Sequence, residues 1–287
     1  MDSSIADVHS AHYSDGLTNS AIMGCSVSTS STNDLGQGLY RLEGHTGMVI
    51  SNNVFTGNQW GRPQIKLNAA SRPSSKLVVS DNKFNGGNGV FPFDIAPQNN
   101  VSDERMTDFI VERNWWVNSG HWFRMINLSA RKGTVRNNIL DGSLGNPGAD
   151  NASIYVSQLG IEPAPDDIQI YNNTFYSRFT DSQNAFWGVV LTSGTNMVVK
   201  NNLAYAPNYA TVQMVVNSAS ATVTNNSTDA QVKTNPFASA TPAVPADFML
   251  PASSYARNAG TAAPVFSDFF RAIRPNGTSI DLGATEF

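Results

Sequence analysis

Cysteine is almost absent from this sequence of 287 residues, and Cys25 is the only one. A disulfide framework within the chain and a multi-cysteine metal site are therefore both excluded. Charged residues are also scarce, at 14%, and 18 basic against 22 acidic residues leave a net charge of −4. The sequence has no basic run of the kind that attracts nucleic acid. It also has no apolar run long enough to span a membrane.

What the sequence does have is 40% hydrophobic residues, enough for a core, and a polar remainder rich in Asn, Ser, Thr and Gly. Helical cytosolic enzymes normally cover their exposed faces with Lys and Glu, so this composition favours a β-protein with long polar loops. The first residues, MDSSIADVHS, lack the basic and apolar regions of a signal peptide. We expect a secreted or periplasmic protein whose leader is absent from this chain.

A hydrophobic-x-x-Asn pattern recurs along the chain. Seven segments align on one asparagine: MVISNNVF (Asn53), LVVSDNKF (Asn82), FIVERNWW (Asn114), GTVRNNIL (Asn138), IQIYNNTF (Asn173), MVVKNNLA (Asn202) and ATVTNNST (Asn226). The residue three positions before each is β-branched: Ile50, Val79, Val111, Val135, Ile170, Val199 and Val223. A weaker eighth copy, SAIMGCSV, has Ile22 in the apolar position and Cys25 in place of the asparagine.

Successive anchors are 24 to 35 residues apart, and the segments alternate apolar and polar residues instead of following a helical period. This pattern predicts an all-β fold, a single-stranded right-handed parallel β-helix of about 7–8 coils over residues 1–229. The β-branched residues would stack inward, and the asparagine amides would hydrogen-bond along the axis. Residues 230–287 break the pattern, and we expect them to form a C-terminal cap packed on the last coil.

A second strand precedes each anchor. With its apolar residues inward, period-two geometry predicts an outward column on adjacent coils, about 4.8 Å apart. The column is Arg41, Lys66, Asp94, Arg124, Tyr155, Val190 and Gln213. Glu43 and Asn68 flank it, and His45 lies two residues beyond Glu43. Such a flat, lengthwise face suits an extended polymer better than a small metabolite.

The column carries the side chains that uronate chemistry needs. Arg41 and Arg124 would bind a substrate carboxylate and stabilise the enolate-like charge that forms when the C5 proton leaves. Lys66, His45 and Tyr155 are the candidates for base and proton relay. The alternative is a solvated face whose alternating charges support each other across strands.

Further candidates for substrate contact lie in the first coil and in loops. His12 or Tyr13 would extend the column, and His121 lies in an adjoining loop. Five tryptophans flank several turns and would stack on sugar rings or fill the core: Trp60, Trp115, Trp116, Trp122 and Trp187. His9 and His12 have the spacing of half a metal site, but no third or fourth ligand is evident, so no metal is assigned. A calcium site is the open alternative. Its oxygen ligands would come from Asp94, Asp103, Glu104 and Asp108, which have no ordered spacing.

The repeats VISNNVF and IQIYNNTF and the end IRPNGTSIDLGATEF resemble the parallel β-helix repeat proteins of the pectin-lyase-like superfamily, over about residues 5–287. The resemblance implies catalytic residues on the outer face of the helix, often with Lys or Arg as base. Gly44-His45-Thr46 is the nearest match to the Gly-His-Gly of polygalacturonases. In the strand from Gln64 to Asn68, the position of Lys66 is similar to that of the catalytic Lys in the chondroitinase-B-like and alginate-lyase-like group. Arg124 follows two coils later.

The leading hypothesis is a polysaccharide lyase that cleaves a uronate-containing polymer by β-elimination. In it Lys66 is the base, Arg41 and Arg124 neutralise the carboxylate, and Tyr155 or His45 relays the proton. One alternative is a glycoside hydrolase that uses Glu43 and Asp94 as its two carboxylates. The other is a non-catalytic carbohydrate-binding adhesin or tailspike-like stalk. The sequence leaves the oligomeric state open.

Overall fold

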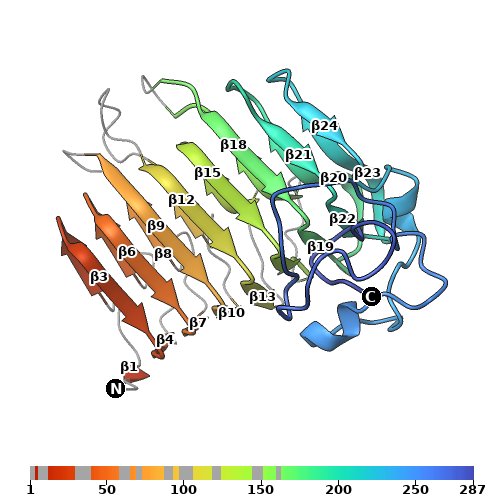
Figure 1. Cartoon of the computed structure of the whole chain (residues 1–287), viewed down its shortest axis with the longest axis horizontal. Helices are drawn as coiled ribbons and strands as arrows, with labels where there is room; N and C mark the ends of the chain where they lie inside the picture. Colours follow the sequence, from red (N-terminus) through yellow and green to blue (C-terminus); the bar gives the residue numbers. More distant parts are fainter. Residues whose placement is uncertain are drawn as a thin grey trace.

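The structure is a computed structural model. It describes residues 4–5, 12–29, 40–57, 65–68, 73–86, 93–96, 106–117, 124–143, 151–159 and 163–287. Strands β1 to β24 form three parallel sheets stacked along one axis (Figure 1). The predicted all-β, right-handed parallel β-helix is therefore confirmed.

Each coil contributes one strand to each sheet. Sheet A consists of β1 (Ser4–Ile5), β4 (Ser26–Thr29), β7 (Val54–Gly57), β10 (Lys83–Asn85), β13 (Trp115–Val117), β16 (Ile139–Asp141), β19 (Thr174–Tyr176) and β22 (Leu203–Tyr205). Sheet B consists of β2 (His12–Asp15), β5 (Tyr40–Glu43), β8 (Ile65–Asn68), β11 (Phe93–Ile95), β14 (Arg124–Leu128), β17 (Asn151–Val156), β20 (Asp181–Leu191) and β23 (Tyr209–Asn217). Sheet C consists of β3 (Thr18–Met23), β6 (Thr46–Ser51), β9 (Ser74–Ser80), β12 (Met106–Glu112), β15 (Arg131–Arg136), β18 (Asp166–Tyr171), β21 (Val198–Lys200) and β24 (Thr222–Thr224).

The asparagine ladder forms as predicted, at the turn from sheet C to sheet A. From Asn53 to Asn202, each anchor Nδ2 donates to Oδ1 of the next anchor along the axis, over 2.9 to 3.0 Å, and Asn226 is the last acceptor. Cys25 occupies the first position, where its backbone N–H donates to Oδ1 of Asn53 over 2.9 Å. The inner anchors are nearly all buried, so the ladder satisfies amides that would otherwise lack partners.

The residue before each anchor has a left-handed backbone conformation, with φ between 49° and 59°. Asparagine tolerates this region better than most residues, because its short polar side chain hydrogen-bonds locally. The turn residues are Asn52, Asp81, Arg113, Asn137, Asn172, Asn201 and Asn225. This series forms an outward-facing column of turn side chains.

The core is built from stacked identical positions. The β-branched residues of sheet C pair in register, as between Val111 and Val135, and those from Ile50 to Val199 are 0% exposed. In sheet A the rings of Phe55 and Phe84 stack with centroids 5.1 Å apart, and those of Phe84 and Trp116 at 4.6 Å. Trp116 is thus a core residue, not a sugar platform.

The C-terminal segment contacts the last coil and also packs against the outer face of sheet A. Val232, in the 3-10 helix η1 (Gln231–Lys233), belongs to the main core, and η1 contacts β22 and β23. The second 3-10 helix, η2 (Pro245–Phe248), belongs to the part that lies over the outer face of sheet A (Figure 1). There Phe248 and Leu282 pack with Ile139 and Leu203.

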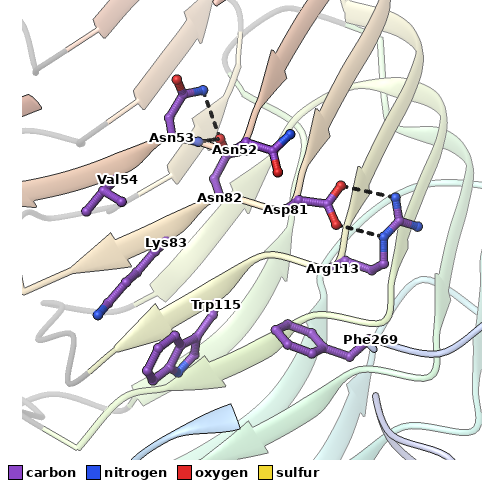
Figure 2. Close-up of a pocket in the computed structure, with 9 residues that line it drawn as sticks. All are labelled: Asn52, Asn53, Val54, Asp81, Asn82, Lys83, Arg113, Trp115 and Phe269. Atoms are coloured by element: carbon purple, nitrogen blue, oxygen red, sulfur yellow. Dashed lines mark hydrogen bonds and ion pairs between the residues drawn. The ribbon is translucent and has the colours of Figure 1, made fainter. Parts of the chain in front are cut away.

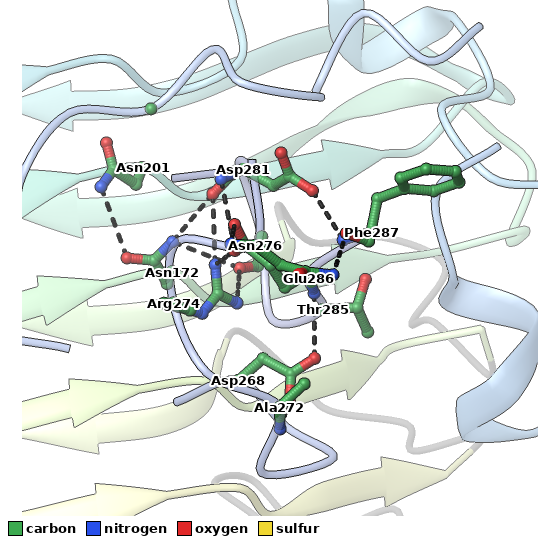
Figure 3. A network of polar contacts seen from close by, with 12 residues as sticks. Asn172, Asn201, Asp268, Ala272, Arg274, Asn276, Asp281, Thr285, Glu286 and Phe287 are labelled. Atoms are coloured by element: carbon green, nitrogen blue, oxygen red, sulfur yellow. Dashed lines mark hydrogen bonds and ion pairs between the residues drawn. The ribbon is translucent and has the colours of Figure 1, made fainter. Parts of the chain in front are cut away.

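Hydrogen bonds fasten this segment to the turn column. Asn137 Nδ2 donates to the carbonyl of Ser267 over 2.7 Å, and Asn201 Nδ2 donates to that of Thr261 over 2.7 Å. Figure 3 shows Asn172 in the same role, donating to the carbonyl of Asp281 over 3.0 Å. The turn asparagines therefore adopt the left-handed conformation that the turn requires, and their side chains also hydrogen-bond to the C-terminal segment.

Candidate functional site

The polar column lies on sheet B, and strand pairing fixes its register. Arg41 pairs with Lys66, and Lys66 pairs with Asp94. On the N-terminal side Tyr13 pairs with Arg41, whereas His12 pairs with Tyr40. Tyr13, and not His12, therefore extends the column along the backbone.

Arg124 does not occupy the predicted column position. Asp94 pairs with Asn127, and Arg124 pairs with Ala152 three residues earlier along the strand. The reason is that β14 has apolar residues on both of its faces, so that sequence alternation does not identify the inward face. Ile126 and Leu128 turn inward, each 0% exposed, and this leaves Asn127 facing outward.

The far end of the column also differs from the prediction. Val190 pairs with Tyr155 as expected, but its next partner is Val216. Gln213 pairs with Trp187 instead. The column is therefore polar through Tyr155 and apolar beyond it.

A continuous set of side-chain contacts joins the polar part, and we call it the sheet B cluster. Lys66 Nζ lies 4.0 Å from Asp94 Oδ2, and Asn127 Nδ2 donates to Asp94 Oδ1 over 2.8 Å. Arg124 Nη1 donates to Asn127 Oδ1 over 2.6 Å, and its guanidinium carbon lies 3.8 Å from the centroid of the Tyr155 ring. Arg124 is thus part of the cluster through its side chain, although its backbone lies outside the column.

The members of this cluster differ in how far they are exposed to solvent. Asp94 is only 5% exposed, whereas the side chain of Lys66 is 27% exposed, and Arg124 and Tyr155 are half-buried. Burial raises the pKa of Asp94, while Lys66, Asn127 and Arg124 act in the opposite direction. Burial also lowers the pKa of Arg124, against the effect of Tyr155 and Asp94. A ligand on this face would therefore meet Lys66, Arg124 and Tyr155, with Asp94 beneath them.

The flanking residues are buried more deeply. Glu43 pairs with Asn68 in the backbone register, as predicted, and its Oε1 accepts a hydrogen bond of 2.5 Å from Arg41 Nε. Arg41 and Glu43 are 8% and 5% exposed. His45 lies in the turn between β5 and β6 and is 1% exposed. These three side chains therefore lie below the surface that a polymer would touch.

Several candidates fall elsewhere. Trp60, His121, Trp122, Asp103 and Glu104 lie outside the described residues. In the described part of the chain, no group of three or more His, Cys, Asp or Glu side chains could hold a metal ion. Nor does any described helix have the length and apolarity needed to cross a membrane.

Sequence reasoning missed Asn127, and although it named Trp115 as a possible sugar contact, it did not place Val54 and Lys83 beside it on sheet A. Val54, Lys83 and Trp115 pair in register and line a pocket beside the turn column (Figure 2). The signal was present, because each follows its anchor asparagine directly in the aligned repeats. Comparison with protein-family models and with curated proteins found no match for this chain.

Proposed function

We propose that this protein is a secreted or periplasmic polysaccharide lyase of the pectin-lyase-like superfamily, acting on a uronate-containing polymer by β-elimination. The observation that carries the proposal is the sheet B cluster, in which an amine on β8, a guanidinium on β14 and a phenol on β17 lie half-exposed along one face. Their flat, lengthwise arrangement matches a chain of sugar units.

Each exposed side chain has a role in this reaction. Lys66, as the neutral amine, accepts the proton from C5 of the uronate. The electron pair of that C–H bond forms the C4=C5 double bond, and the bond from C4 to the glycosidic oxygen breaks. Tyr155 gives its proton to the departing oxygen, and Arg124 binds the carboxylate and stabilises the enolate-like charge.

The buried residues hold these groups in position. Asp94 lies between Lys66 and Asn127, and Asn127 in turn accepts a hydrogen bond from Arg124. The Arg124 guanidinium stacks on the ring of Tyr155, so its plane is fixed before substrate binds. Pre-positioning of this kind contributes to catalysis because little reorganisation is needed at the moment of reaction.

The hydrolase alternative has less support. Its two carboxylates would be Glu43 and Asp94, and each is 5% exposed. A hydrolase needs both carboxyl groups at the scissile bond, about 5–9.5 Å apart. No observation favours that arrangement here.

The test is a panel of alginate, pectate, glycosaminoglycans and bacterial exopolysaccharides, read by ultraviolet absorbance of the unsaturated product and by reducing ends. We expect both signals on one uronate polymer. Lys66→Ala should lower the rate at least about a hundredfold. Lys76→Ala, on the exposed face of sheet C, should leave it unchanged.

Other outcomes would replace the proposal. Reducing ends without ultraviolet absorbance would identify a hydrolase. If no polymer is cleaved but one retards the protein in affinity electrophoresis, the protein is a binding module. Full activity of Lys66→Ala would remove Lys66 as the base.

A further inference from the structure

The pocket on the outer face of sheet A has a defined floor. Val54, Lys83 and Trp115 are neighbours on β7, β10 and β13, and they point away from the core formed by the next residue of each strand. Ile139 continues the same column on β16, but there the C-terminal segment covers it. The pocket therefore begins where this segment stops covering the sheet.

The walls of the pocket are held by ion pairs. Arg113 donates to both carboxylate oxygens of Asp81, over 3.0 and 3.2 Å, and Arg271 lies 3.1 Å from the same carboxylate. Phe269 of the C-terminal segment stands beside Trp115 (Figure 2). The Asp81 carboxylate thus pairs with two guanidinium groups, one from the β-helix and one from the C-terminal segment, and these ion pairs hold the pocket wall in place.

The remaining groups define a ligand chemistry. Lys83 Nζ lies over the Trp115 ring, 4.7 Å from its centroid, so a cation and an aromatic surface are in direct contact in this pocket. Val54 is 37% exposed, and the Asn52 side chain lies at the rim. The pocket volume of about 350 Å³ falls within the range of small-ligand sites, about 300–1,000 Å³.

We propose that this pocket binds a sugar unit that carries a carboxylate, at a site separate from the sheet B cluster. The apolar C–H face of the pyranose packs against Trp115 and Phe269, and the carboxylate pairs with Lys83. The choice of an acidic sugar rests on the proposed function, whereas the platform and its cation do not. The site holds a non-reacting part of the polymer while another part lies on sheet B.

The experiment follows the indole N–H signal of Trp115 by NMR, assigned with Trp115→Phe, during titration with glucuronate, galacturonate and mannuronate oligomers. We expect a saturable shift of this signal with at least one of them. Glucose oligomers of equal length should produce a shift only at about tenfold higher concentration, because they lack the charge. Lys83→Met keeps the side-chain stem and should weaken uronate binding by a similar factor.

Two matched variants separate this site from the reaction. Lys66→Ala should leave the Trp115 shift unchanged while it removes cleavage, and Lys76→Met should change neither. If no uronate oligomer moves the signal, or if glucose oligomers move it equally well, the pocket proposal is overturned. A Trp115 shift that survives Lys83→Met unchanged would overturn it too. Cleavage without a Trp115 shift would support the lyase proposal and overturn the pocket proposal. A Trp115 shift without cleavage would support the pocket proposal and overturn the lyase proposal.

Discussion

Asn127 Nδ2 donates a hydrogen bond of 2.8 Å to Oδ1 of Asp94 on the neighbouring strand of sheet B. This contact joins the two halves of the sheet B cluster, because Lys66 approaches Asp94 from one side and Arg124 approaches Asn127 from the other. Burial already raises the pKa of Asp94, so the hydrogen bond acts on a carboxyl group that is short of solvent. The loss of stability when this hydrogen bond is removed should therefore depend on pH.

Asn127→Ala should destabilise the protein more at neutral pH than in acid. A carboxyl whose folded pKa is raised contributes stability below its unfolded pKa of about 3.9, and this is lost as the pH rises through the folded pKa. Without Asn127 the pKa rises further and the loss extends to higher pH. We expect a cost of about 1.5–3 kcal/mol at neutral pH, measured by urea unfolding, and a smaller cost near pH 4. In an Asp94→Asn background the pH dependence of this cost should vanish. Its persistence there would show that Asp94 is not the titrating group.

Tyr155→Phe tests the proton relay. The ring that supports Arg124 remains, while the hydroxyl is lost. If Tyr155 protonates the leaving oxygen, kcat on the cleaved polymer should fall by about 10² to 10⁴ with KM nearly unchanged. Tyr155→Leu should raise KM as well, since Arg124 loses its stacking partner. Equal kcat values for wild type and Tyr155→Phe would assign the proton to another donor.

The ladder could be read from the sequence because each coil carries one distinctive residue at one fixed position. Ile50, Val79 and the later β-branched residues pair as their alignment on the asparagines predicts. Cys25 also takes its expected place in the ladder. An anchor whose side chain hydrogen-bonds to its copy on the next coil leaves no freedom of register.

Sheet B has no such anchor, and there prediction from sequence failed in part. The strand RMINL can bury either Met125 or the pair Ile126 and Leu128, and sequence periodicity alone does not decide between them. The structure buries all three, and strand pairing places Asn127 outward. The path of the C-terminal segment was equally hidden, because it does not repeat and its contacts are with residues far away in sequence.

Asn138→Ala should be among the costliest single changes in the β-helix. Asn138 is 0% exposed, and its Nδ2 donates to Asn173 Oδ1 and to the carbonyl of Val111, each over 2.9 Å. Its Oδ1 accepts from both the backbone and the side chain of Asn114. Each buried partner left alone costs about 1–3 kcal/mol, so we expect a loss of at least about 3 kcal/mol in chemical unfolding.

The matched control is Asn226→Ala at the end of the ladder. Asn226 is also an acceptor for Asn202, but it is partly exposed, so water replaces much of what it loses. We expect about 1 kcal/mol there. Equal losses at Asn138 and Asn226 would contradict the view that the ladder stabilises by satisfying buried amides.

Arg274→Met should release the C-terminal segment from the flank of the β-helix. The Arg274 side chain is 0% exposed, its Nη1 lies 2.7 Å from Glu286 Oε2, and its Nη2 donates to the carbonyl of Gly283 over 2.8 Å (Figure 3). Burial raises the pKa of Glu286, and Arg274 is the main opposing charge. Removing one partner of a buried ion pair costs about 3–5 kcal/mol. Limited proteolysis should then cut within residues 260–287 while circular dichroism still reports the β-sheets.

Arg271→Met is the matched control, because Arg271 pairs with Asp81 over 3.1 Å but its side chain is 65% exposed. That change should cost less than about 1 kcal/mol. The pH range of the effect separates the two variants further, because the pKa of Asp81 is lowered whereas that of Glu286 is raised. In Arg274→Met the Glu286 carboxyl loses its guanidinium, so its pKa rises and the deficit grows as the pH rises from about 4 to about 7. Protection of the segment in Arg274→Met at neutral pH would mean that apolar packing of Phe248 and Leu282 holds it without this ion pair.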